Sequence, residues 1–424
     1  MDKFNLHELL SQADESEVGT IFEDFIREQT KAMVISVMMD EVAKLCGKSY
    51  HPKDIPLYRR AGTAPGYIIL NRKIEKTPRP RVRQKMADGK EVEVELKTYR
   101  AAQDSKAVEA AILQAVAAGV SSRGVVDVLP EAPSTSSSAV SKQWAKAGIY
   151  YIAKFRERNF TKESPEGWFA LMIDAIVLTN GLVAIVALGL TVDGRKMILD
   201  FEIGSSENFE TCSLLLGRLK ERSFTFGGPP LAVLDGSLAL AKAVRAHFKD
   251  VRIQRCLVHK ERNIRACLSK RHYGELARLF NLLRNVEGED AGRERLADLR
   301  RFLSSHSHKA TESLDEAGDE LITLHILNAP STLNVSLLST NNIENIFTST
   351  RLKINRVTRW RSDTNQADRW LAYAFGEAEK GFRRIKGYKD IPTLLEHLRW
   401  STEAVSKAKE IVASVKTAES SKNK

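Results

Sequence analysis

Cysteine is scarce in this sequence, with four in 424 residues. They are Cys46, Cys212, Cys256 and Cys267. So few thiols in so long a chain exclude a disulfide framework and fit a reducing cytoplasm.

A zinc site is a possible alternative use for two of these cysteines. Cys256, His259, Cys267 and His272 would supply four ligands of the right kind. However, the apolar pattern predicts a single helix over residues 260–284, on which Cys267 belongs to the apolar face and His272 points elsewhere. We therefore do not favour zinc.

The sequence also lacks a membrane-spanning run and a secretion signal. Its most apolar window, residues 171–192, is interrupted by Asp174 and by the hairpin signal Asn180-Gly181. This pattern predicts two buried strands. The first residues do not show a basic segment followed by an apolar one. We expect a protein that spans no membrane and acts in the cytoplasm.

Negative charge is in deficit, with 54 acidic against 65 basic residues and a net charge of +11. That balance favours an anionic partner, and nucleic acid is the first candidate. The length is sufficient for two or three domains.

Residues 1–100 are expected to form a helical and basic β-hairpin region. Residues 17–48 have helical periodicity, and Asp88-Gly89 predicts a turn that folds a strand back on the segment before it. That segment carries cations at alternate positions, which share one face of a strand. They are Arg79, Arg81, Arg83 and Lys85. Phosphate binding and a solvated edge strand are both consistent with this pattern.

Residues 101–148 predict helices separated by a turn at 119–123. Arg123 follows the turn, and Lys142 and Gln143 lie early in the last helix. In a helix-turn-helix such residues face bases and phosphates, so we expect DNA binding. An ordinary helical hairpin is the alternative.

The most informative pattern spans residues 165–260. Asp174 interrupts an apolar strand, where an unpaired charge costs several kcal/mol unless a metal, a basic partner or a shifted pKa neutralises it. The order of elements is three strands, helix, strand, helix, strand, and the fourth strand ends at Asp235. This is the RNase H-like order, in which Asp174 and Asp235 lie on neighbouring strands.

Two neighbouring aspartates repel each other unless a cation bridges them, and Mg²⁺ prefers oxygen ligands. A pair of such ions can promote phosphodiester cleavage, which usually requires a third carboxylate. Glu344, in a predicted helix, is the candidate. A basic stretch containing Trp360 follows it, and there DNA contact competes with a solvated helix face. Its candidate contacts are Arg351, Lys353, Arg356 and Arg359.

The remaining segments complete a multi-domain α/β protein. Residues 261–332 predict an all-helical insertion, and residues 333–400 predict the C-terminal part of the core, including the third acid. Residues 401–424 are expected to be a partly disordered tail.

Several motifs together resemble the mutator-type transposases of bacterial insertion sequences, which belong to the DDE class. They are Ile173-Asp174-Ala175, Leu234-Asp235-Gly236, Gln254-Arg255-Cys256-Leu257-Val258-His259 and Thr340-Asn341-Asn342-Ile343-Glu344. The likeness extends upstream through Ala64-Pro65-Gly66 and Gly119-Val120-Ser121, and covers roughly residues 20–385. One departure is Ser237, where the family often has histidine; it removes no metal ligand.

The resemblance implies an RNase H-like mixed sheet flanked by helices, with a helical insertion and an N-terminal DNA-binding region. It implies that Asp174, Asp235 and Glu344 bind two Mg²⁺ ions, which Mn²⁺ could replace, and that Cys256 and His259 shape the site. The implied activity is cleavage at terminal inverted repeats, then transfer of the 3′-hydroxyl into target DNA. The implied partners are double-stranded DNA and a second copy in a dimer, on the bacterial nucleoid.

Two rival functions stay open. One is an inactive or domesticated transposase that only binds DNA, and the other is an RNase H-like nuclease of another kind.

Overall fold

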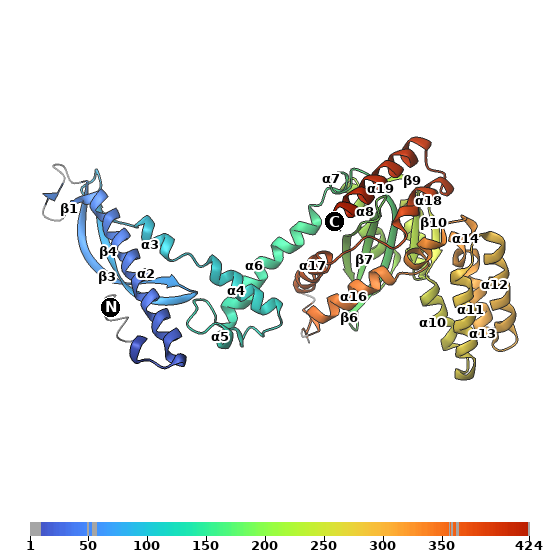
Figure 1. The fold of residues 1–424 in the computed structure, drawn as a ribbon, viewed down its shortest axis with the longest axis horizontal. Coiled ribbons are helices and arrows are strands. Elements are labelled where there is room, and N and C mark those ends of the chain that lie inside the picture. The colour runs from blue at the N-terminus through green and yellow to red at the C-terminus, as the bar shows by residue number, and fades with distance from the viewer. Residues whose placement is uncertain are drawn as a thin grey trace. The chain divides into compact units, whose positions relative to one another are not determined.

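The computed structural model describes residues 10–48, 51–52, 57–355, 357, 359–361 and 364–422 (Figure 1). The chain divides into two compact units, residues 1–147 and 148–424. Each has its own buried core.

A long helix on a three-stranded sheet forms the first part of unit 1. The helix is α2 (Glu15–Cys46), followed by β1 (Gly47–Lys48) and β2 (His51–Pro52). The sheet has the order β3 (Tyr58–Leu70), β4 (Lys73–Lys85), β5 (Glu91–Val94), and both pairings are antiparallel. Met38 and Val42 of α2 pack on Ile68 and Val82 of the sheet. The predicted hairpin turn is confirmed, with Gly89 at a φ of +80°.

Helices make up the rest of unit 1. They are α3 (Lys97–Ala102), α4 (Lys106–Ala117), α5 (Val125–Val128) and the start of α6 (Ser137–Arg156). Val108, Ile112 and Val116 are buried at helical spacing on α4. The helices predicted here are confirmed, and their DNA-binding role stays a prediction.

A five-stranded mixed sheet is the centre of unit 2, after the short α7 (Phe160–Glu163). In chain order it is built from β6 (Trp168–Thr179), β7 (Leu182–Thr191), β8 (Lys196–Gly204), α8 (Phe209–Glu221), β9 (Phe226–Leu234), α9 (Leu238–His247) and β10 (Arg252–Arg255). The spatial order is β10-β9-β6-β7-β8, with β6, β7 and β8 antiparallel and β9 and β10 parallel to β6. The predicted sequence of elements is confirmed.

The two faces of this sheet bury different sets of helices. Leu171 and Ile173 of β6 belong to the core formed with α8 and α9. Met172 and Ile176 belong to the opposite core, which the later helices cover. Because side chains alternate along a strand, Asp174 lies on the face of Met172 and Ile176.

A helical segment follows β10. It comprises α10 (Leu257–Ala266), α11 (Tyr273–Asn285), α12 (Glu289–Ser304), α13 (His308–Ala317), α14 (Thr323–Ile326) and α15 (Asn334–Leu337), with short 3₁₀ turns between some of them. The prediction of one helix over 260–284 is wrong. Ser269 adopts an extended conformation (φ −67°, ψ 143°), so α10 ends and the chain restarts at α11.

The C-terminal part contains α16 (Asn341–Ile354), α17 (Gln366–Glu379), α18 (Ile391–His397) and α19 (Thr402–Lys422). Residues 402–422, within the segment expected to be a partly disordered tail, form the helix α19. Val405 and Ala408 are buried on α19 in the same core as Leu394 and Leu398. This apolar spacing at i and i+3 gives the helix a face to bury. Within the described part of the chain, no helix is both long and apolar enough to cross a membrane.

Candidate active site

Asp174 is the buried acid of the site, with 6% of its surface exposed in the middle of β6. Its Oδ1 accepts a hydrogen bond from the backbone N–H of Ala175 at 2.8 Å. Its Oδ2 is buried, and no described residue donates a hydrogen bond to it. Burial is the main cause that raises the pKa of Asp174 to about 6, and the charges of Asp235 and Glu344 add to the rise. The raised pKa agrees with the prediction that a charged carboxylate in this apolar strand is energetically unfavourable.

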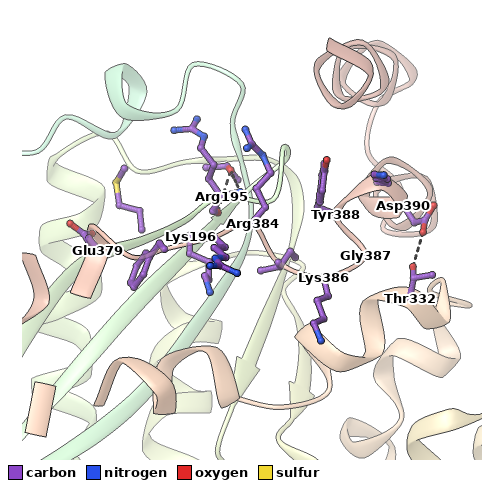
Figure 2. Close-up of a pocket in the computed structure, with 15 residues that line it drawn as sticks. Arg195, Lys196, Thr332, Glu379, Arg384, Lys386, Gly387, Tyr388 and Asp390 are labelled. Atoms are coloured by element: carbon purple, nitrogen blue, oxygen red, sulfur yellow. Dashed lines mark hydrogen bonds between the residues drawn. The ribbon is translucent and has the colours of Figure 1, made fainter. Parts of the chain in front are cut away.

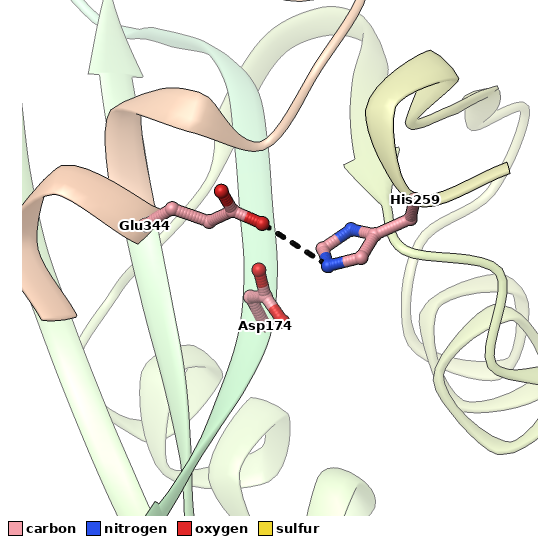
Figure 3. A group of neighbouring side chains, drawn as sticks. All are labelled: Asp174, His259 and Glu344. Carbon is pink, nitrogen blue, oxygen red and sulfur yellow. Dashed lines mark ion pairs between the residues drawn. The ribbon is translucent and has the colours of Figure 1, made fainter. Parts of the chain in front are cut away.

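His259 brings a basic nitrogen to this acid from the first turn of α10. Its Nε2 lies 3.1 Å from Oε1 of Glu344. Figure 3 marks this ion pair with a dashed line. A hydrogen bond to the Cys256 side chain, helped by the charges of Asp174 and Glu344, raises the pKa of His259 to about 9 despite partial burial. The imidazole is therefore largely protonated at neutral pH.

Glu344 completes the cluster from the first turn of α16. One ligand atom from each of Asp174, His259 and Glu344 lies within 4.8 Å of the other two. Glu344 points toward this centre because Ile343 and Phe347, its neighbours on α16, are buried against the core. Nη2 of Arg262, at the exposed edge of the site, lies 4.0 Å from Oε1 of Glu344.

Asp235 lies beside this cluster but is not a member of it. The neighbouring-strand prediction is confirmed by the pairing of Leu234 with Ile173, the residues just before Asp235 and Asp174. Oδ1 of Asp235 accepts the N–H of Ser237 at 2.9 Å. Its charge contributes to the raised pKa of Asp174, so the two acids interact electrostatically.

Cys256 ties the two helices of the cluster together. The fully buried Sγ caps α10 by accepting the N–H of His259 at 3.5 Å, and it also accepts the N–H of Thr340 at 3.3 Å. Burial raises the pKa of this thiol, but the hydrogen bonds from His259 and Thr340 outweigh burial and leave the pKa lowered. The N–H of Leu257 donates to the carbonyl of Leu338 at 2.9 Å. The start of α10 and the approach to α16 are thus fixed to each other.

A buried basic network supports the loop of Asp235. Nη2 of Arg255 donates to the carbonyl of Gly236 at 2.9 Å. Nη1 of Arg255 and Nζ of Lys260 reach the carboxylate of Glu316 on α13, at 2.7 and 2.8 Å. The Arg255 side chain is only 7% exposed and that of Lys260 only 3%. The helical segment after β10 is thereby connected to the second acid.

Some of the candidate DNA-binding residues of unit 1 form ion pairs with acidic residues, and others are exposed. Arg79 and Arg81 both bind Glu93 of β5 at 2.7 Å, and Arg83 lies 3.5 Å from Glu91. Acidic residues of β5 therefore neutralise part of the basic face of β4. Neither the phosphate-binding interpretation nor the edge-strand interpretation included these ion pairs. Lys85 is exposed.

Three further candidates of unit 1 lie around the helices. Arg123 and Lys142 are exposed. Nε2 of Gln143 donates to the carbonyl of Ser134 at 3.3 Å. This contact gives Gln143 a structural use that the sequence did not reveal.

The candidates of unit 2 share the helix of Glu344 or follow it. Arg351 and Lys353 are exposed in the last turn of α16, and Arg359 is exposed beyond it. Arg356 lies outside the described residues. The alternative zinc set does not assemble: within the described ranges, only Asp174, His259 and Glu344 form a metal-sized group of His, Cys, Asp or Glu.

Three features of the site went unrecognised in the sequence. They are the direct approach of His259 to Glu344, the support from Arg255, and Glu207. Burial raises the pKa of Glu207, which precedes α8, and the charge of Asp235 raises it further. The polar run Ser205-Ser206-Glu207 carried no periodic signal.

The donor set fits a hard divalent cation. Two carboxylates converge, and the buried Oδ2 of Asp174 has no hydrogen-bond donor among the described residues. The protonated imidazole of His259 supplies the positive charge that balances these acids. Deprotonated, its Nε2 would be a third ligand atom.

Comparison with known proteins gives a consistent relationship. Residues 1–384 match the family model described as Transposase, Mutator family. The chain is 32% identical over 180 residues to the transposase for insertion sequence element IS6120 of Mycolicibacterium smegmatis, covering 42% of this chain and 54% of that protein. It is 24% identical over 305 residues to the transposase for IS905 of Lactococcus lactis, covering 69% and 74%. It is 29% identical over 177 residues to the transposase for IS256 in transposon Tn4001 of Staphylococcus aureus, covering 40% and 44%. The aligned part thus spans about half of the first and third relatives.

Proposed function

We propose that this chain, which belongs to the Mutator family of transposases, cuts DNA at the ends of its element and joins the freed ends to a target. The sheet order β8-β7-β6-β9-β10 supports an RNase H-like core for this chemistry. Bacterial nucleoid DNA in the cytoplasm is the proposed substrate, and a dimer on DNA the proposed active form.

One observation carries the proposal. Asp174 and Glu344, which are 170 residues apart in the sequence, bring ligand atoms to within 4.8 Å, and Asp235 directly follows β9, the strand that pairs with the strand of Asp174. Burying like charges is unfavourable, and a protein tolerates it where a cation is to be bound.

Asp174, Asp235 and Glu344 are the proposed holders of Mg²⁺ or Mn²⁺. When bound, two such ions would supply Lewis acidity to activate a water or a 3′-hydroxyl and to stabilise the leaving oxygen. Asp174 is held rigidly by its apolar strand, which also keeps bulk water away from one side of the site. His259 and Cys256 hold α10 against α16, so that Glu344 keeps its orientation. One site could serve cleavage and transfer, because both are displacements at phosphorus.

DNA is proposed to reach this site through two basic regions. In unit 1 the candidates are Arg79, Arg81, Arg83, Lys85, Arg123, Lys142 and Gln143. In unit 2 they are Arg351, Lys353, Arg356 and Arg359. Cations of this kind bind the phosphate backbone, while base contacts from the helices after Arg123 would select the terminal repeat.

Two substitutions test the catalytic proposal. Asp174→Asn and Glu344→Gln should abolish nicking of a terminal-repeat duplex in Mg²⁺, while repeat binding changes by only a few fold. Glu312→Gln is the matched control, because Glu312 is a solvent-exposed acid on α13. Cleavage retained by Asp174→Asn would refute the assignment. A wild-type protein that binds the repeat but never nicks it would favour the inactive, regulatory alternative.

A further inference from the structure

A large hollow in unit 2 lies at the end of the β7–β8 hairpin and is lined mostly by residues 379–390 (Figure 2). Its volume is about 940 Å³. Six of its lining residues are basic and two are acidic. The basic residues are Arg195, Lys196, Arg383, Arg384, Lys386 and Lys389. None of them was singled out by the sequence patterns.

The acids of this hollow do not neutralise its cations. Glu379 is engaged by Arg158, which donates two hydrogen bonds to it at 2.8 and 2.6 Å. Asp390 accepts the hydroxyl of Thr332 at 2.7 Å. Arg383, Lys386 and Lys389 are exposed, and no carboxylate among the described residues pairs with any of them. Three cations are therefore available to an anion that enters the hollow.

Two other cations that line the hollow, Arg384 and Arg195, bind Asp193 in the β7–β8 turn. Arg384 donates to the carbonyl of Asp193 at 3.0 Å and to its carboxylate at 2.9 Å. Arg195 also binds Asp193, through Nε at 3.0 Å. The segment after α17 is thus fixed to the β7–β8 turn, so the three available cations stand on an anchored loop.

Lys196 connects the hollow to the helix of the third acid. Its Nζ donates to Oδ1 of Asn342 at 3.3 Å, and Asn342 precedes Glu344 by two residues in the first turn of α16. The same Nζ lies 5.4 Å from the ring centre of Phe382. The hollow is therefore coupled to the start of α16 and offers an aromatic surface beside its cations.

We infer that this hollow binds the sugar-phosphate backbone of a DNA strand close to the scissile phosphate, through Arg383, Lys386 and Lys389. The inference rests on the proposed function for its ligand, and it adds a DNA contact in the catalytic unit. Repeated phosphates match a set of exposed cations that no described carboxylate neutralises, and backbone contacts of this kind position DNA without reading its sequence.

The test uses the full chain carrying Arg383→Gln, Lys386→Gln and Lys389→Gln together. Its affinity for a terminal-repeat duplex that continues into flanking DNA is measured over a series of KCl concentrations without Mg²⁺. We expect affinity to fall at least about tenfold, and the slope of log K against log salt to become shallower by about 2–3 units, because each phosphate contact contributes about 0.9. An unrelated duplex should show the same change in slope.

The matched control removes the same charge elsewhere in unit 2, through Lys249→Gln, Lys309→Gln and Lys407→Gln, three exposed cations that do not line the hollow. A loss no larger than that of this control would overturn the inference, as would an unchanged salt slope. Both triple variants should keep the thermal unfolding profile of the wild type. Because binding is measured without cleavage, the result is independent of whether Asp174→Asn abolishes nicking.

Discussion

Nε2 of His259 lies 3.1 Å from Oε1 of Glu344, and the pKa of this histidine is raised to about 9. The protonated His259 ring supplies positive charge that balances the converging carboxylates of Asp174 and Glu344. Since the folded pKa exceeds the unfolded value of about 6.5, protonation of His259 stabilises the fold. This stabilisation is fully present below about pH 6.5 and is lost as the pH rises through about 9.

The first prediction follows from the stabilisation of the fold by protonated His259. His259→Gln should lower the free energy of unfolding by about 1–2 kcal/mol at pH 6, and the deficit should shrink well above pH 9, where the wild-type ring is neutral. Urea unfolding in EDTA at several pH values measures the difference. An equal deficit at pH 6 and pH 10 would show that His259 acts by packing alone.

The second prediction concerns the cost of Asp174. Burial raises its folded pKa to about 6, so ionisation destabilises the fold as the pH rises through about 6. In EDTA at pH 8, Asp174→Asn should increase the free energy of unfolding by on the order of 1–3 kcal/mol. At pH 4 the wild-type acid is protonated and the gain should vanish. If the variant is less stable at pH 8, the charge of Asp174 is already compensated by the protein alone.

The third prediction concerns Arg255, a positioning residue that donates to the carbonyl of Gly236 at 2.9 Å, next to Asp235. Arg255→Gln should raise the Mg²⁺ concentration needed for half-maximal cleavage and slow cleavage by about 10- to 100-fold, as loss of a supporting contact does at metal sites. Repeat binding should stay near the wild-type value. The matched control is Arg300→Gln, since Arg300 forms an exposed ion pair with Asp315 at 2.8 Å. An unchanged Mg²⁺ requirement would limit Arg255 to a structural role.

The fourth prediction concerns Cys256, whose Sγ accepts N–H groups from His259 and Thr340. Cys256→Ala removes this cap and should cost about 1–2 kcal/mol of stability, with slower cleavage because α10 and α16 lose a contact. Cys256→Ser keeps an acceptor and should retain more of both. Chemical denaturation and nicking assays measure the two effects. If the two variants behave alike, the volume of the sulfur matters and its hydrogen bonds do not.

Local sequence patterns were sufficient to predict much of the secondary structure of unit 2. Asn180-Gly181 predicted a hairpin turn, and Gly181 adopts a positive φ of +72°. Such short-range signals act through backbone conformation, so they are readable without knowing the fold. The break near Ser269 and the helix over residues 402–422 were not recognised in this way, because each depends on packing or backbone conformation that no turn signal marks.

The sequence by itself determined the order of strands and helices along the chain, the apolar surroundings of Asp174, and the excess of positive charge, because these follow from periodicity and composition. Only the tertiary structure decided that His259 contacts Glu344, that Arg255 supports the loop of Asp235, and that one hollow is lined by three exposed cations that no described carboxylate pairs with. Those relationships join residues 85 positions apart, for His259 and Glu344, and up to 199 apart, for Thr191 and Asp390 at the hollow, and the packing of the helices against the sheet sets their distances.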